Sequence, residues 1–489
     1  MTEKTAGRNT LSRRAALAAG AALGGAVVGG LSWGVIGQSD GIVGWAGLDS
    51  IRDNPSGSYS LATNIDENSS GYDDYASPDA NDGDGWEPIG GFDGTFNGNG
   101  YSISDLFIER TTPGEDSNIG FFGSVSGAVS NLGVLGVDID GTDSLGALAG
   151  SNSGDISNCF ASGVIDISDS RMWQAERAGG LVGRNTGSIT NSWSRTSVSC
   201  GEEVGGLVGR NEGTIEESYV DALVISGAES YVGGFVGSNT GDISSCYAEV
   251  SSIGDRFNSQ FPITGHGGFA GENTDGGSIE ECYTPSSVWV NMVFDESVYV
   301  GGFVGENTDG AVVSHSYAAG EGDDLEKTGG GVAGLNTATL DVVYYNEDLN
   351  DVGVGEDSGT SNVIGVEQFD MRGASAEDEM DQLDFEHTWE TVDYRTPPDS
   401  PVLQVLLPDP IGPFENRPHD LSGDGLFDDV NGDLTSSVVD VQALLQHLDD
   451  PVVQDFAHRF NYSGDNPGIV TEDDVHAMFE DITGDDADA

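Results

Sequence analysis

The chain has 489 residues, of which 83 are acidic and 17 basic, so its formal net charge is −66. This charge excludes nucleic acid and anionic membranes as expected partners, because both repel an acidic surface. The acidic residues are spread along a chain that is 37% hydrophobic, which indicates a folded protein with an acidic surface. Molar salt shortens the Debye length to roughly 3 Å, so such a surface suits very high salt.

The N-terminus resembles a twin-arginine export signal. Ser12, Arg13, Arg14 and Leu17 are followed by an apolar stretch rich in Ala and Gly, which ends near residue 37. We therefore expect residues 1–37 to be a signal peptide, with a retained N-terminal anchor as the alternative. We expect no further transmembrane segment, because no second apolar run of spanning length follows.

A glycine-rich phrase recurs through the middle of the chain. "GGLVGRNTGSIT" at 179–190 returns as "GGLVGRNEGTIE" at 205–216 and as "GGFVGSNTGDIS" at 233–244. Each copy has a glycine two residues before an asparagine, then a branched apolar residue, a small residue and usually an aromatic. The aligned asparagines are Asn152, Asn185, Asn211, Asn239, Asn273, Asn307 and Asn336. The repeats span about 119–345.

Self-similarity at this period predicts a solenoid, and the short β-branched segments between glycines predict strands. We expect an all-β solenoid, a right-handed parallel β-helix over residues 38–365. An antiparallel or propeller-like array is the rival, although 26–34 residues are few for a propeller blade. Stacked coils would align the asparagines into a hydrogen-bonded ladder, with glycines providing positive φ or close approach at the corners.

Two further positions of the aligned repeats would each form a column of stacked side chains. Cys159, Cys246 and Cys282 stand where other copies have serine, so we expect small buried side chains, with a Cys246–Cys282 disulfide left open. The aromatic column would form an external stripe suited to sugar rings, unless another segment covers it. The column begins at Phe160, and the stripe would consist of Trp193, Tyr219, Tyr247, Tyr283 and Tyr317.

The longer repeats carry inserts at 167–178, 254–265 and 286–297. Inserts in solenoids collect on one face, which is often the binding face. The aromatic residues in these inserts are therefore candidate ligand-binding residues, with ordinary loop packing as the alternative. They are Trp173, Phe257, Phe261 and Trp289.

The repeated phrase, followed by a small residue and an aromatic, resembles the GLUG-motif repeat of exported bacterial and archaeal surface proteins. "WEPIGGFDGTFNGNGYSISDL" at 86–106 is similar to the opening segment of such β-helices. The segments "DQLDFEHTWETV" and "SPVLQ", near 381–404, are similar to the closing segment, so residues 366–404 would cap the β-helix. The resemblance implies an adhesin-like surface protein, and the charge implies a haloarchaeal one.

A proline-rich linker is expected at 405–418, and acidic loops follow it. Oxygen-bearing residues fall at positions 1, 3, 5, 7 and 12 of a calcium loop, directly before an apolar helix. They are Asp429, Asn431, Asp433, Thr435 and Asp440, and Asp420, Ser422 and Asp424 are possible additional ligands. A second, expanded loop would use Asn461, Ser463, Asp465 and Asp474.

Two loop–helix units over 419–483 resemble a dockerin domain. This resemblance implies calcium as the bound ion and a cohesin-like or other surface protein as the partner. The sequence departs from the loop pattern where Leu434 replaces the expected glycine. The alternative is an acidic tail in which the spacing is coincidental.

Nothing in the sequence forms a recognisable catalytic constellation. We expect no catalytic residues and a non-catalytic exported protein, at the cell surface or secreted, assembled through its calcium-binding module. The alternative is a polysaccharide-binding or polysaccharide-degrading β-helix, a lyase or hydrolase, for which carboxylates around Arg171 would be the first candidates.

Overall fold

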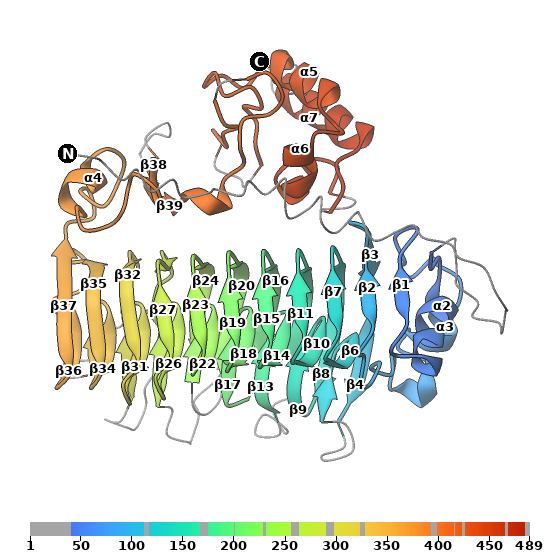
Figure 1. The fold of residues 1–489 in the computed structure, drawn as a ribbon, viewed down its shortest axis with the longest axis horizontal. Coiled ribbons are helices and arrows are strands. Elements are labelled where there is room, and N and C mark those ends of the chain that lie inside the picture. Colours follow the sequence, from blue (N-terminus) through green and yellow to red (C-terminus); the bar gives the residue numbers. More distant parts are fainter. Residues whose placement is uncertain are drawn as a thin grey trace, which may run out of the picture. The chain divides into compact units, whose positions relative to one another are not determined.

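The computed structural model describes residues 41–484 except 112–116, 167–174, 200, 228–230, 256–263, 290–297, 323–327, 393–398, 415, 423–425 and 465–467. In this part of the chain, successive repeats stack as the coils of a β-helix (Figure 1). Strands of neighbouring coils pair in parallel and in register, so that Asn185 aligns with Asn211 and Asn211 with Asn239. The predicted parallel β-helix is therefore confirmed, and its handedness stays a prediction.

Two short-stranded sheets form two sides of each coil. The nine-stranded sheet consists of β6 (Phe122–Val125), β10 (Ala149–Asn152), β14 (Val182–Asn185), β18 (Val208–Asn211), β22 (Val236–Asn239), β26 (Ala270–Asn273), β31 (Val304–Asn307), β34 (Ala333–Asn336) and β36 (Val354–Asp357). The eight-stranded sheet consists of β5 (Asn118–Ile119), β9 (Asp143–Gly146), β13 (Ala175–Gly179), β17 (Glu203–Gly205), β21 (Tyr231–Gly233), β25 (Gly265–Gly267), β30 (Tyr299–Gly301) and β33 (Gly329–Gly330).

The third sheet has 20 strands, because most coils contribute two to it. They are β1 (Ser58–Ser60), β2 (Thr95–Asn97), β3 (Ser102–Ser104), β4 (Phe107–Arg110), β7 (Ala128–Ser130), β8 (Gly133–Gly141), β11 (Asp155–Ser157), β12 (Phe160–Asp166), β15 (Ser188–Thr190), β16 (Trp193–Ser199), β19 (Thr214–Glu216), β20 (Tyr219–Gly227), β23 (Asp242–Ser244), β24 (Tyr247–Asp255), β27 (Ser278–Glu280), β28 (Tyr283–Thr284), β29 (Val288–Trp289), β32 (Val312–Ala318), β35 (Thr339–Asn346) and β37 (Thr360–Val366).

Helices lie at the two ends of the described chain. At the start are α2 (Trp45–Asp49), η1 (Ser50–Asp53), α3 (Tyr72–Tyr75) and η2 (Asn81–Gly83). After the β-helix come α4 (Ser375–Glu379), the antiparallel pair β38 (Trp389–Val392) and β39 (Asp399–Leu403), η4 (Gln404–Leu406), α5 (Val438–Gln446), α6 (Pro451–Asp455), η5 (Ala457–Arg459) and α7 (Glu472–Gly484). Among the described residues, no helix is long and apolar enough to cross a membrane.

The core of the β-helix is built from repeated columns of apolar side chains. One column runs through Ile189, Ile215 and Ile243, all of which are buried. In another column, Phe235 stacks on Phe269 with ring centroids 4.7 Å apart. Parallel in-register strands place like residues above one another, so the sequence repeat becomes a continuous stack of apolar contacts.

The asparagine ladder runs through the coils as expected. The side-chain amide of Asn185 donates to Asn211 Oδ1 at 2.8 Å, and that of Asn211 donates to Asn239 Oδ1 at 2.8 Å. The same bond continues to Asn336, which donates to Asp357 Oδ1 at 3.1 Å. These asparagines are buried, so the ladder satisfies amides that would otherwise be costly to bury.

The motif glycines are needed because the backbones of neighbouring strands approach closely there, and not because the chain adopts a positive φ. None of the glycines that precede the asparagines by two residues adopts a left-handed conformation, and a Cβ at Gly183 would lie 2.6 Å from the carbonyl oxygen of Gly150. The left-handed corner is instead the residue just before the small-residue column. It is occupied by Asn158, Asn191, Glu217, Ser245, Glu281, His315 and Val342, with φ between 47° and 57°.

The small-residue column is buried and shares hydrogen bonds between coils. The backbone N–H of Cys159 donates to Ser192 Oγ at 3.1 Å, and that of Cys282 donates to Ser316 Oγ at 3.1 Å. Cys159, Cys246 and Cys282 are buried free thiols, so the Cys246–Cys282 disulfide is not formed. Cys200 lies outside the described residues.

The segments that follow β37 pack into two further apolar clusters. Trp389 and Leu403 belong to one cluster with Tyr317 and Tyr344 of the β-helix. Val405 and Leu406, at the start of the predicted linker, pack on this cluster. The other cluster is the core of the C-terminal module (residues 419–484), and it includes Ile411 of the linker together with residues of α5, α6 and α7. Residues of the predicted linker thus pack on both clusters.

Candidate functional site

The first predicted calcium loop places two buried carboxylates at its ends. Asp429 accepts hydrogen bonds from the backbone N–H groups of Asp433 at 2.9 Å and Leu434 at 2.8 Å. Asp440, in the first turn of α5, accepts from the N–H groups of Asn431 at 3.2 Å and Ser437 at 2.9 Å. The loop therefore wraps around both carboxylates, as a calcium loop does.

Leu434 takes the conformation that the loop needs. Its φ is +63°, in the left-handed region where calcium loops have their glycine. In the same turn, Asn431 Oδ1 accepts from the N–H of Asp433 at 2.9 Å. Asp433 and Thr435 are exposed. The sequence departure at Leu434 therefore preserves the backbone of the loop.

The electrostatics of this loop favour a cation. Burial raises the pKa of Asp440, and the nearby charge of Asp429 raises it further. His419 Nδ1 lies 2.9 Å from Asp429 Oδ2. Among the described residues, no three His, Cys, Asp or Glu side chains form a metal-binding group. A calcium ion here would rely on the two buried carboxylates together with amide, carbonyl and water oxygens.

The second predicted loop has the same closing carboxylate. Asp474, in the first turn of α7, accepts from Ser463 N–H at 3.1 Å, Ser463 Oγ at 2.7 Å and Thr471 N–H at 2.8 Å. Asn461 stands at the first position of the loop, and its Oδ1 is buried with no hydrogen-bond partner. An orphaned oxygen at this position fits a cation ligand. Asp465 lies outside the described residues.

The additional ligands predicted near Asp420 are placed differently. Asp420 is buried, accepts from Ser422 Oγ at 3.3 Å and lies 3.7 Å from Arg459 Nη2. A carboxylate that faces a guanidinium has a charge partner already. Asp424 lies outside the described residues.

Of the predicted ligand-binding aromatics, the structure describes one. Trp289 lies on β29 and is 59% exposed, paired in register with Gly254 of β24. Trp173, Phe257 and Phe261 lie outside the described residues. The structure therefore does not bring these four side chains into a common site.

The aromatic column forms a continuous stack on the outer face of the third sheet, here called the aromatic row. The centroids of successive rings are 4.8–5.9 Å apart, and the ring planes are nearly parallel. Its members are Phe160, Trp193, Tyr219, Tyr247, Tyr283 and Tyr317. The row is covered for most of its length, which confirms the alternative to an open stripe, because Trp389 packs on Tyr283 and Tyr317, and His458 packs on Trp193 and Tyr219.

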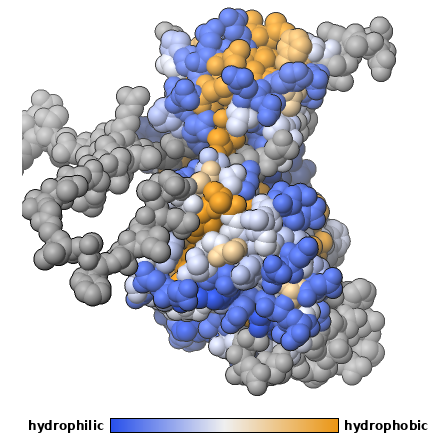
Figure 2. All heavy atoms as spheres, turned by 90° about the vertical axis from the view of Figure 1, so that its right-hand side faces the viewer, coloured by the Kyte–Doolittle hydropathy of each residue, from blue (hydrophilic) through white to orange (hydrophobic). Residues whose placement is uncertain are grey.

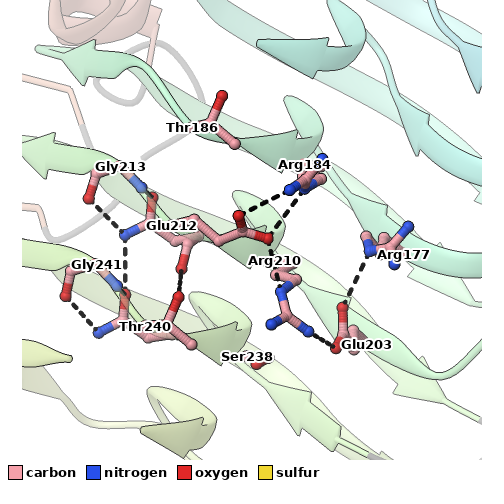
Figure 3. A network of polar contacts seen from close by, with 12 residues as sticks. Arg177, Arg184, Thr186, Glu203, Arg210, Glu212, Gly213, Ser238, Thr240 and Gly241 are labelled. Atoms are coloured by element: carbon pink, nitrogen blue, oxygen red, sulfur yellow. Dashed lines mark hydrogen bonds and ion pairs between the residues drawn. The ribbon is translucent and has the colours of Figure 1, made fainter. Parts of the chain in front are cut away.

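A charged network crosses the two short-stranded sheets (Figure 3). Arg184 forms a two-pronged ion pair with Glu212, at 2.7 and 3.0 Å. Arg210 bridges Glu212 at 2.9 Å and Glu203 at 2.8 Å, and Arg177 Nε lies 3.4 Å from Glu203. The Arg184 bond lowers the pKa of Glu212, whereas burial raises the pKa of Glu203 despite its arginine neighbours. All three arginines have carboxylate partners, which indicates a structural role.

Arg184 and Arg210 belong to a column of aligned residues in the nine-stranded sheet, here called the charged column. Further along this column the charged residues are acidic. Glu272 on β26 aligns with Glu306 on β31. Glu272 accepts from Ser238 Oγ at 2.6 Å, and burial raises its pKa. Burial, followed by the charge of Glu272, raises the pKa of Glu306 to about 7. Sequence reasoning missed the charged column. Each of its residues stands directly before a ladder asparagine, so the aligned copies of the repeat contain the signal that locates it.

Comparison with known proteins identifies the repeat. Residues 228–254 match the family model described as the GLUG motif. The chain carries a GLUG motif. It is similar to halomucin of Haloquadratum walsbyi, with 34% identity over 133 residues, which are 26% of this chain and 1% of halomucin. It is also similar to a candidate Gly-rich membrane protein of Evansella cellulosilytica, with 45% identity over 85 residues.

These matches are partial. The chain spans 1% of halomucin and 10% of the Evansella protein. Among solved structures, it is similar to a candidate immunoglobulin A1 protease from Bacteroides ovatus, at 17% identity and a TM-score of 0.37, over 74% of this chain and 91% of that one. An IgA1 protease is similar over 66% of this chain and 20% of its own, at 19% identity and a TM-score of 0.31.

The glutamates of the GLUG coils give a pH-dependent prediction. Glu306 has a folded pKa of about 7, above the ordinary value of 4.5, so ionising it costs free energy in the folded state only. This cost is absent below pH ~4.5, grows as the pH rises, and is complete above pH ~7. We therefore expect Glu306→Gln to stabilise the protein above pH ~7 by about 1–2 kcal/mol, discounted for partial exposure, and to have little effect near pH ~4.

The measurement is thermal unfolding of both proteins across this pH range in molar salt. Glu356→Gln is the matched control, because Glu356 is an exposed glutamate in the same column. Equal pH profiles for the Glu306→Gln variant and the wild type would contradict the raised pKa.

Proposed function

We propose that the protein is a non-catalytic cell-surface or secreted protein. Its β-helix is a rigid scaffold, and its C-terminal module is a dockerin-like unit that binds calcium and a partner protein. The observation that carries the proposal is the pair of loop–helix units, each of which closes on a buried carboxylate, Asp440 or Asp474. The names of the matched relatives, halomucin and a Gly-rich membrane protein, fit a surface location.

The scaffold role rests on repetition. The core of each coil packs against the cores of its neighbours, and the Asn ladder continues from coil to coil. Such solenoids are long, stiff and tolerant of surface change. The acidic charge of −66 keeps their outer surface solvated at high salt. Export through the predicted twin-arginine signal at 1–37 belongs to the same proposal.

Calcium is the ion that the loops fit. Buried carboxylates with additional amide and backbone oxygens are ligands for a hard cation. Asp429 and Asp440 would hold calcium in the first loop, with Asn431, Asp433 and the Thr435 carbonyl as the other protein ligands. Asn461, Ser463, Asp465 and Asp474 would hold it in the second loop. Binding would neutralise the carboxylates and stabilise the module.

The partner surface would be the helical face of the module. Figure 2 shows apolar atoms gathered at the top of the view, over this module. Val438, Val439 and Leu445 of α5 are about half exposed, as is Phe479 of α7. Other side chains of the same helices, such as Leu444 and Met478, are buried in the module core. A cohesin-like or other surface protein would cover the exposed apolar residues.

A polysaccharide panel tests the non-catalytic proposal against its alternative, a polysaccharide-active enzyme. The purified chain would be incubated in molar salt with calcium, and binding and released reducing or unsaturated ends would be followed in the same wells. We expect no product on any polysaccharide. Product formation would overturn the proposal, and loss of that product in Glu306→Gln would assign it to the Glu272–Glu306 pair.

A further inference from the structure

The outer face of β16 carries an aromatic residue that is nevertheless buried. Val198 and Thr196 face the core, so strand alternation places Trp193 and Arg195 on the opposite face. Arg195 is exposed, and its guanidinium lies 5.3 Å from the Trp193 ring. Trp193 itself is only 6% exposed. Something other than the β-helix core must therefore cover it.

The cover is the C-terminal module. The ring of His458, in η5, lies 5.4 Å from Trp193 and 5.8 Å from Tyr219. A Cβ at Gly468, in the second loop, would lie 2.2 Å from the carbonyl oxygen of Gly100 and 3.1 Å from the ring of Phe160. Two parts of the module thus contact the β-helix at the first rungs of the aromatic row. Both contacts lie within one compact unit of the chain, residues 40–489.

The contacting segment η5 is held between the two loops. The backbone N–H of Phe427, two residues before Asp429, donates to the carbonyl oxygen of Arg459 at 2.8 Å. The guanidinium of Arg459 lies 4.6 Å from the Phe427 ring. On the other side, the second loop begins at Asn461, three residues after His458. The position of His458 therefore depends on the conformation of both loops.

We propose that calcium loading of the two loops fixes the C-terminal module on the aromatic row, and that calcium removal releases the module and uncovers Trp193 and Tyr219. The inference rests on the proposed function, because it requires the loops to bind calcium. Without the ion, the buried carboxylates of Asp429 and Asp440 in the first loop repel one another, and the Asn461 oxygen in the second loop has no partner. The loops therefore lose the geometry that positions η5 and Gly468. The partner-facing residues of α5 and α7 are separate from these contacts.

Fluorescence quenching of Trp193 tests this inference on the full chain. Acrylamide is used because it is uncharged, and the Trp193 signal is taken as the difference between the wild type and Trp193→Phe. We expect chelation by EGTA in molar salt to raise the quenching of Trp193 several-fold. His458→Ala and Gly468→Val should give the same rise with calcium present. His476→Ala is the matched control, because His476 is an exposed histidine of α7 in the same module.

Calcium uptake is followed in the same samples with a fluorescent competing chelator. If calcium binds but Trp193 stays protected after chelation, the inference is overturned and the proposed function stands. If His458→Ala and Gly468→Val both leave Trp193 protected in calcium, the inference is also overturned. If no calcium binds, the proposed calcium module fails, and this inference fails with it.

Discussion

Gly209→Ala is expected to destabilise the β-helix by about 4 kcal/mol or more, although it adds a single methyl group. A Cβ at this position would lie 2.6 Å from the backbone nitrogen of Ala178, 2.7 Å from the carbonyl oxygen of Gly183 and 2.9 Å from that of Glu203. These are backbone atoms, which cannot rotate away as a side chain can. The coils would have to separate locally, which breaks the parallel hydrogen bonds between them.

Gly90→Ala is the matched control for this substitution. A Cβ at Gly90 would have no atom within 4 Å, and Gly90 has no positive φ, so alanine should be neutral or slightly stabilising. Thermal and denaturant unfolding in molar salt measure both variants. If Gly209→Ala unfolds like Gly90→Ala, close approach is not the reason for the glycine.

Asn211→Ala is expected to cost about 3–4 kcal/mol. Asn211 accepts from the side-chain amide of Asn185 at 2.8 Å and donates to Asn239 Oδ1 at 2.8 Å. It also closes its own turn by donating to the carbonyl oxygen of Gly213 at 3.2 Å. Alanine would leave buried amide groups on both neighbouring coils short of a partner and would open a cavity between them.

The control for the ladder is Asn362→Ala. Asn362 is exposed on β37 and donates to Asp341 at 3.3 Å, so its loss should change the free energy of unfolding by less than ~0.5 kcal/mol. Hydrogen exchange would locate the damage of Asn211→Ala in the coils of β14, β18 and β22. A uniform small effect for both asparagines would mean that the ladder contributes no more than a surface hydrogen bond.

Repetition explains why so much of the β-helix follows from the sequence. Seven aligned asparagines can share a ladder only if the strands are parallel and in register, and the isoleucine column then has to face the core. The left-handed corner was not predictable in the same way. It is filled by residues as different as Asn191, Glu217 and Val342, so no residue type marks it.

Whether the aromatic row is exposed or buried depends on contacts between residues far apart in the sequence. His458 packs against Trp193 from a segment 265 residues later in the chain, and a local sequence pattern carries no information on such a contact. The charged column was missed for another reason. Arg210 and Glu306 have opposite charges at equivalent positions of their coils. No single residue type therefore marks the column in the sequence.

Calcium titration of the full chain in molar potassium chloride tests the central claim, that the C-terminal loops form a calcium-binding module. We predict two bound ions, loss of one in Asp429→Ala and of the other in Asp474→Ala, and no loss in Asp409→Ala, an exposed acidic control. Chelation should remove the helical signal of α5 and α7 and leave the β-sheet signal intact. Absence of uptake, or a helical signal that does not respond to chelation, would contradict the claim.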